Sequence, residues 1–203
     1  MSEQVHERTE ALLRRVAREV GDDGRLPLPD VTTWEIFPFE GDLRVKRLEE
    51  PVLPEPARPG EGGLECGSCR SGLTNAIWAD DRWKLVAPAP SAIPMVLLCP
   101  IDHLDLPDLD LVRAREMGFL AWRVDAALTA LGGTGRVHMN RWGDGGAHLH
   151  IWFFARPEGM LQLRGSSLSD WTDCLPPMPP FEWTATMRRV AEEMTRLGGR
   201  ALV

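Results

Sequence analysis

Between residues 75 and 155, short apolar runs are arranged around one long helical pattern, and this order restricts the fold more than any other feature of the sequence. Short apolar runs bounded by turn residues are typical of β-strands, and apolar residues that recur every three or four positions predict an amphipathic helix. Strands before and after one helix indicate an α+β domain. We expect strands over residues 75–78, 83–86, 94–99, 136–141 and 147–155 and a helix over residues 108–131.

The N-terminal part of the chain has a looser pattern. Residues 5–20 place apolar side chains on one side of a helix that ends at Gly21. Two short strands are expected over residues 34–39 and 43–48. The Pro- and Gly-rich residues 51–63 that follow are typical of a linker.

Charge and hydropathy narrow the class of protein. The formal net charge is −7, which argues against a broad nucleic-acid-binding surface, because such a surface needs a cluster of basic residues. A small anionic ligand is compatible with this charge, since a few local donors decide its binding. No apolar run reaches the roughly 18 residues of a transmembrane helix, and the polar N-terminus lacks the apolar stretch of a signal peptide. We therefore expect a cytoplasmic protein with no membrane partner.

The chain contains four cysteines, and their spacing bears on metal binding. Cys66 and Cys69 form a C-x-x-C pair, which in the cytoplasm indicates metal or redox chemistry rather than a secreted disulfide framework. Cys99 lies in an apolar run and is expected to be a small buried hydrophobic residue.

His148 and His150 lie in the sequence Gly-Gly-Ala-His-Leu-His-Ile-Trp, inside the last expected strand. Side chains two positions apart on a strand point to the same face, so both imidazoles should converge on one pocket while Leu149 and Ile151 point into a core. Two imidazoles in front of an apolar wall can present a nitrogen nucleophile. The same pair could instead form hydrogen bonds at a sheet surface with no catalytic role.

Groups that can bind a phosphate surround this pair in the sequence. Asn140 lies on the preceding expected strand, and its amide can orient a phosphate or an imidazole. The turn that contains Gly145 and Gly146 offers backbone N–H groups to phosphate oxygens. Arg156, just past the strand, can supply a fork of donors, and Arg141 is an alternative for that role.

Together these residues resemble the signature of the histidine triad (HIT) superfamily. The upstream half agrees, because Cys66-Gly-Ser-Cys69 is followed by two strand-like segments and by a Pro-x-x-His segment that ends at His103. The downstream half of the resemblance rests on Asn140, Gly145-Gly146, His148-Leu-His150-Ile and Arg156-Pro157.

The resemblance covers roughly residues 64–157, and it divides the chain into three parts. Residues 1–63 form an N-terminal extension of helix, short strands and linker. Residues 64–157 form the HIT-like core. Residues 158–203 form a C-terminal extension, with a Pro-rich loop over 175–181 and a helix over 184–197.

The resemblance implies both a fold and a chemistry. The expected fold is α+β, an antiparallel sheet with one long helix packed on it, and the family forms homodimers by pairing sheets edge to edge. In the family's His-φ-His-φ-His-φ-φ motif, where φ is apolar, the middle histidine attacks the α-phosphate of a nucleotide. A covalent nucleotidyl-histidine forms, and water or another acceptor then takes the nucleotide. We therefore expect a hydrolase or nucleotidyltransferase acting on a phosphoanhydride, phosphoester or phosphoramidate.

The sequence departs from the family motif, because it has two histidines and a shorter spacing from the glycines. In one register His148 is the first position, His150 is the nucleophile and Trp152 replaces the third histidine. In the other, His148 is the nucleophile and His150 is the third position. We favour the first register, in which Trp152 can stack on a base but cannot shuttle a proton.

The resemblance also implies a structural zinc ion. Some HIT-like proteins hold zinc with the C-x-x-C cysteines, the Pro-x-x-His histidine and the first histidine of the motif. These positions map onto Cys66, Cys69, His103 and His148, which would form a closed tetrahedral set. This assignment gives His148 a role as a ligand and leaves His150 free to attack.

Two other kinds of protein fit the same residues. A zinc-stabilised nucleotide-binding protein would need the pocket but no turnover. A small redox or metal-handling protein would need a reactive thiol at Cys66 or Cys69 that no metal holds.

Overall fold

The computed structural model describes residues 2–203, and side chains from Arg8 onward. The chain separates into two compact units, the first ending at Pro56 and the second running from Ala57 to Val203. Within the described residues, no helix combines the length and the apolar character that a membrane span requires.

The first unit contains the expected helix but not the expected strands. Helix α1 covers Ser2–Glu19, which agrees with the prediction over residues 5–20. Residues 34–39 and 43–48 form no strand, so this part of the prediction is wrong. Trp34 and Leu48 are exposed by 56% and 58%, so the two segments lack the buried face that stabilises a hairpin.

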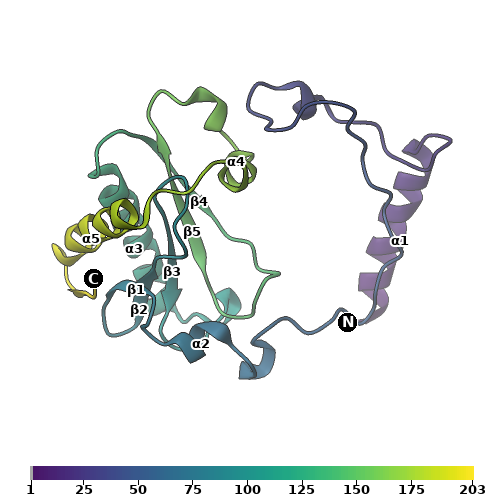
Figure 1. The fold of residues 1–203 in the computed structure, drawn as a ribbon. Helices are drawn as coiled ribbons and strands as arrows, with labels where there is room; N and C mark the ends of the chain where they lie inside the picture. The colour runs from purple at the N-terminus through teal and green to yellow at the C-terminus, as the bar shows by residue number, and fades with distance from the viewer. Residues whose placement is uncertain (1) are drawn as a thin grey trace. The chain divides into compact units, whose positions relative to one another are not determined.

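The second unit is built on a six-stranded antiparallel sheet with the strand order β4-β5-β3-β2-β1-β6 (Figure 1). The predicted antiparallel α+β fold is therefore confirmed. Its strands are β1 (Ala76–Ala79), β2 (Trp83–Val86), β3 (Met95–Pro100), β4 (Thr134–Asn140), β5 (Ile151–Pro157) and β6 (Arg200–Ala201). Its helices are α2 (Gly67–Ser71), α3 (Leu111–Thr129), α4 (Leu168–Cys174) and α5 (Pro180–Thr195).

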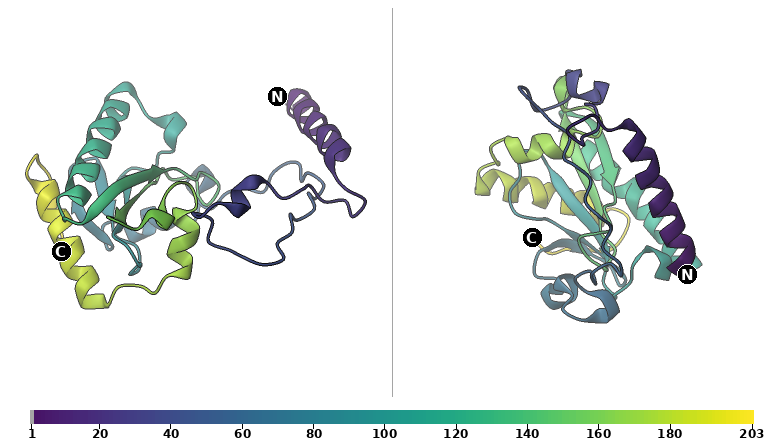
Figure 2. Two further views of the ribbon diagram at one scale, coloured as in Figure 1. Left: turned by 90° about the horizontal axis from the view of Figure 1, so that it is seen from above. Right: turned by 90° about the vertical axis from the view of Figure 1, so that its right-hand side faces the viewer.

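Helices α3 and α5 lie side by side on one face of the sheet and bury the main core against it (Figure 2). Asp110 begins α3 by accepting a hydrogen bond from the backbone N–H of Arg113, which satisfies a free donor at the helix start. Trp183 and Met187 of α5 belong to the same core cluster as Phe153 of β5. The C-terminal helix is thus part of the packed body of the second unit.

The opposite face of the sheet carries the polar and aromatic side chains. Leu149, Ile151 and Phe153 belong to the main core, so His150, Trp152 and Phe154 face the other way. Phe154 packs in a second, smaller cluster with Leu163 and with Leu168 of α4. This polar face, opposite α3 and α5, holds the sites described below.

The two histidines lie just before β5 rather than within it. The prediction of a strand from residue 147 is wrong at its start, because β5 begins at Ile151. The N–H of Ala147 donates to the carbonyl of Pro59, and the N–H of Leu149 donates to the carbonyl of Leu104, so these backbone groups pair with loops and not with a neighbouring strand. Leu149 is nevertheless buried and His150 half-buried, so the alternation of the strand continues into this segment.

Candidate metal centre and nucleophile

Two cysteines and two histidines from three separate segments converge beside the start of β5. The ligand atoms of Cys66, Cys69, His103 and His148 all lie within 4.8 Å of one another. His148 Nδ1 is 3.4 Å from Cys66 Sγ and 3.5 Å from Cys69 Sγ, and Cys69 Sγ is 3.5 Å from His103 Nδ1. The four residues named from the sequence as one set therefore come together in space.

The surroundings of His148 suit a metal ligand. His148 is 5% exposed, and its Nε2–H donates to the carbonyl of Pro100 over 2.9 Å, which leaves Nδ1 as the free lone pair that faces both thiols. Burial lowers the pKa of His148, although the bond to Pro100 opposes this shift. A neutral imidazole whose second nitrogen is held by a carbonyl is the usual form of a histidine ligand.

The donor chemistry of this cluster fits zinc. Two thiolates and two imidazoles form a tetrahedral set with no open position, which is typical of a structural site. Gly60 allows the close packing, because a Cβ on it would lie 3.3 Å from Cβ of Cys66 and 3.4 Å from Cε1 of His103. The cluster can therefore bind a metal ion, and its ligand types favour zinc.

Two cysteines of this region have raised pKa values. Partial burial and the neighbouring Cys66 thiol raise the pKa of Cys69. Burial raises the pKa of Cys99 to about 12. A raised pKa favours the protonated thiol in the metal-free protein, and a bound metal ion would hold Cys69 as the thiolate.

His150 is oriented by the backbone of His148. The two atoms His150 Nδ1 and the His148 carbonyl oxygen lie 2.8 Å apart, so Nδ1 carries the proton and Nε2 the lone pair. A nucleophilic imidazole needs this tautomer. His150 lines two adjoining cavities, and Gly145 lines both of them as well.

The first cavity, with a volume of about 400 Å³, contains a buried positive charge. Lys84 of β2 is 2% exposed, and its Nζ donates to the carbonyls of Ser68 and Gly72. No carboxylate of the described residues pairs with it. A buried ammonium group without a counterion favours an anionic ligand in the cavity that it lines.

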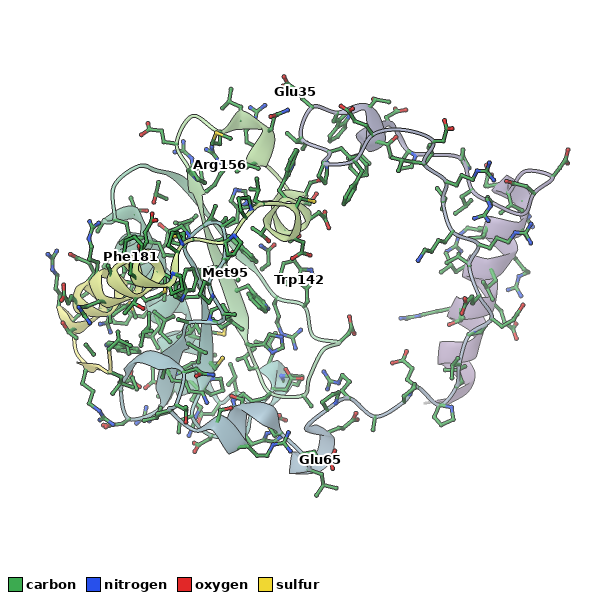
Figure 3. The ribbon with its side chains drawn as sticks, in the orientation of Figure 1. Glu35, Glu65, Met95, Trp142, Arg156 and Phe181 are labelled. Atoms are coloured by element: carbon green, nitrogen blue, oxygen red, sulfur yellow. The ribbon has the colours of Figure 1, made fainter. Side chains whose placement is uncertain are left out.

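The second cavity, of about 350 Å³, is aromatic. The rings of Trp142 and Trp152 lie 6.3 Å apart in an edge arrangement, and Trp152 stacks on Phe154 at 5.9 Å. Figure 3 shows Trp142 and Met95, which both line this cavity. Such a surface can hold a planar ring.

The remaining predicted substrate-binding residues divide into two groups. Gly145 and Gly146 line the first cavity with His150, as their position in the sequence suggested. Asn140 pairs with Trp152 across β4 and β5 and is half-buried, but it lines neither cavity.

The structure does not bring Arg156 to the histidines. Arg156 lies six positions after His150 along an extended chain, which corresponds to about 20 Å. Its guanidinium group donates to the carbonyls of Pro157 and Met160, and it lines a different cavity. Arg156 is thus misplaced for a phosphate at His150, because it lies at the far end of β5. Arg141, the alternative, instead pairs with Asp105 at 2.7 Å.

Two residues that organise the site are hard to recognise in the sequence. Lys84 holds α2, which contains Cys69, against β2 through its hydrogen bonds to the carbonyls of Ser68 and Gly72. In the sequence, the one indication of this role is a charged residue inside an apolar run. Asp105 pairs with both Arg58 and Arg141, and Arg58 also donates to the carbonyl of Gly143. The hydrogen bonds that Asp105 accepts lower its pKa, although burial opposes the shift. Asp105 thereby joins the loop after His103 to the glycine turn before His148.

Comparison with known proteins bears on the fold. The sequence matches no protein-family model and no curated protein. Among solved structures, it is similar to a histidine triad protein from Marinobacter aquaeolei VT8, with a TM-score of 0.51 and 15% identity over 64% of this chain and 96% of that one. It is also similar to a histidine triad protein from Sinorhizobium meliloti 1021, with a TM-score of 0.50 and 20% identity over 58% of this chain and 87% of that one. The chain therefore has a histidine triad (HIT)-like fold.

Proposed function

We propose that the protein is a HIT-like nucleotide-phosphate hydrolase or nucleotidyltransferase in which His150 is the nucleophile. The observation that carries the proposal is the bond between His150 Nδ1 and the carbonyl of His148, which leaves Nε2 with a lone pair in a residue that lines two cavities. His148 faces the two thiols instead, and this geometry favours the first of the two registers.

In the proposed first step, His150 Nε2 attacks the α-phosphorus of a nucleotide. A P–N bond forms, and the P–O or P–N bond to the leaving group breaks. In the second step a water or acceptor oxygen attacks phosphorus, the P–N bond to His150 breaks, and the attacking group loses its proton to solvent. The neutral imidazole is then regenerated.

The groups around His150 supply charge and donors for this reaction. The buried ammonium group of Lys84 and the backbone of Gly145 and Gly146 are suited to the phosphate, because they line the same cavity as His150. Trp152 and Trp142 offer a surface on which a base can stack. Asn140 lines neither of these cavities, so we assign it no contact with the substrate.

The Cys66, Cys69, His103 and His148 cluster would hold zinc. The ion would fix the position of His148, and thereby the carbonyl to which the His150 ring donates. Thiolate ligation requires reduced cysteines, which agrees with the expected cytoplasmic location.

One observation favours a second function, that of a nucleotide-binding protein with little turnover. Trp152 occupies the third position of the motif, and an indole cannot donate the proton that a basic leaving group needs. In the enzyme, this proton has to come from solvent, so substrates with a weakly basic leaving group are favoured.

A homodimer is part of the proposal. Strand β4 lies at the edge of the sheet, and α3 exposes Phe119 and Trp122 by 49% and 59%. An unpaired edge strand is a surface with which a second copy can pair, and exposed aromatic side chains are a surface that a second copy can cover. Light scattering at several protein concentrations measures the molar mass in solution, and we expect the mass of two chains.

The test of catalysis is intact-protein mass spectrometry after incubation with nucleotides and dinucleoside polyphosphates, under conditions that avoid acid. Wild type, His148→Ala and His150→Ala are compared, and the zinc content of each is measured in parallel. We expect a mass increase of one nucleoside monophosphate in the wild type, which His150→Ala lacks although it keeps its zinc.

The other outcomes are equally clear. An adduct that persists in His150→Ala and disappears in a zinc-loaded His148→Ala would assign the nucleophile to His148. Saturable binding with neither adduct nor turnover would establish the binding protein.

A further inference from the structure

The far end of the polar face holds a third cavity, which is rich in basic side chains and lies away from His150. It has a volume of about 600 Å³ and lies around the ends of β4 and β5. It shares no lining residue with the two cavities at His150. Its polar side chains are those of Arg136, His138, Arg156, Glu158 and Arg164.

These basic side chains converge because of strand register. Arg136 pairs directly with Arg156 across β4 and β5, and His138 lies two positions along β4 on the same face. Arg164 comes from the loop that follows β5. Figure 3 shows Arg156 and Trp142 at different places on the unit, and this separation distinguishes the cavity from the aromatic one.

The positive charge of this cavity is not balanced by the protein. None of the three arginines forms an ion pair with a carboxylate in the part of the chain that the structure describes. Glu158 is the one acidic residue in the lining, so the cavity has a formal excess of two positive charges with His138 neutral. Among the residues that the structure describes, Arg136 donates to the backbone carbonyl of Gly135 and Arg164 to that of Leu161, and to no other group.

Arg156 supplies a second, independent indication of a ligand. Arg156 is 7% exposed, and its Nε is buried without a hydrogen-bond partner among the described residues. Nη1 alone is anchored, by the carbonyls of Pro157 and Met160. A buried guanidinium group with an unsatisfied N–H costs free energy unless an acceptor reaches it. An anion in the cavity would balance the charge of this guanidinium group, and the unpartnered Nε marks a side chain that the protein alone does not satisfy.

We propose that this cavity is a second binding site, for a phosphate-bearing small molecule with at least two negative charges. Guanidinium groups match phosphate geometry with paired donors, and three of them line the cavity. Its volume leaves room for an organic group attached to the phosphate. The site is separate from the nucleophile, so it would hold a regulatory ligand or effector and not the reacting phosphate.

The test uses His138 as a local reporter, because its imidazole lines the cavity and the histidines of the metal centre do not. The ring signals of His138 are followed by NMR in the full-length, zinc-loaded protein and are assigned by loss in His138→Gln. Pyrophosphate and inorganic phosphate are titrated separately, with sodium acetate at equal ionic strength as the control for screening. We expect a saturable shift with pyrophosphate, a weaker one with phosphate and none with acetate.

The variants locate the site. Arg136 and Arg164 are exposed, so the double variant Arg136→Gln/Arg164→Gln should fold normally, and we expect its dissociation constant for pyrophosphate at His138 to rise at least tenfold. The double variant Arg188→Gln/Arg189→Gln, at two exposed arginines on α5, removes the same charge elsewhere and should leave that constant unchanged. A titration with no saturable shift at His138, or one that the double variant does not weaken, would overturn the proposal.

Discussion

The two ends of β5 contrast in how their polar groups are held. At the His150 end, the imidazole nitrogens of His148 and Nδ1 of His150 have partners, and the backbone N–H groups of Ala147 and Leu149 are bound to distant loops. At the Arg156 end, a buried guanidinium group leaves one N–H without a partner. The same strand therefore carries a fixed arrangement at one end and an incomplete one at the other.

The contrast separates two requirements of function. A nucleophile has to be held in one tautomer and one orientation before the substrate arrives, and only contacts already made by the protein can do this. A binding site can leave donors unsatisfied, because its ligand completes them. We therefore expect a substitution at the His150 end to remove either the chemistry or the stability of the metal cluster, depending on which contact it breaks.

The largest effect is expected for His150→Ala. Removal of a nucleophile commonly costs on the order of 10⁴-fold or more in turnover, while a half-buried imidazole contributes little to the core. Release of nucleoside monophosphate measures turnover, and circular dichroism with zinc analysis checks that the variant is folded and loaded. Turnover within tenfold of wild type would remove His150 from the reaction.

The next effect is expected for Cys66→Ser, which removes a buried ligand from the metal cluster. Loss of a structural metal ion costs several kcal/mol of folding free energy, because the ion binds only the folded state. We expect substoichiometric zinc and a markedly lower melting temperature by calorimetry. Cys174→Ser, at an exposed cysteine outside the cluster, is the matched control and should change neither quantity.

A smaller effect is expected for Asp105→Asn. The Asp105 carboxylate is largely buried and pairs with Arg58 and Arg141, so its loss should lower the free energy of unfolding by about 2 kcal/mol. Urea denaturation of the zinc-loaded protein measures this change in the free energy of unfolding. Asp102→Asn, at an exposed carboxylate that pairs with Arg113, should have little effect. Equal effects of the two substitutions would show that Asp105 does not join the two loops.

The smallest effect is expected for Trp142→Ala. Trp142 is 45% exposed and lines the aromatic cavity, so its removal should weaken nucleotide binding by about 1 kcal/mol without unfolding the protein. Calorimetric titration of a nucleotide into His150→Ala and into the double variant gives the ratio of dissociation constants, expected to be several-fold. An unchanged ratio would place the base outside the aromatic cavity.

Much of the second unit could be predicted because its signals are local. The strands over residues 75–99 and the helix over 108–131 follow from apolar periodicity and turn residues, and the structure contains them with small shifts of their ends. The metal cluster was predicted from a resemblance in motif spacing. Apolar periodicity could not have predicted it, because the rings of His103 and His148 lie 5.4 Å apart although 45 positions separate the two residues in the sequence.

The errors arose where distant contacts decide the outcome. Residues 34–48 have strand-like composition but no partner to bury them. The backbone at residues 147–149 has a strand-like alternation, yet its N–H groups bond to Pro59 and Leu104, far away in the sequence. Arg156 was assigned by nearness in the sequence, although an extended strand carries it away from the histidines.

His148 belongs to two assemblies at once, because its side chain lies in the metal cluster and its carbonyl holds the His150 ring. An ion that orders the side chain and a substrate that needs the ordered ring favour the same conformation. By thermodynamic reciprocity, each must raise the affinity for the other by the same factor. The cluster should therefore bind a metal ion more tightly when the cavity at His150 is filled, so that the two sites behave as one cooperative unit.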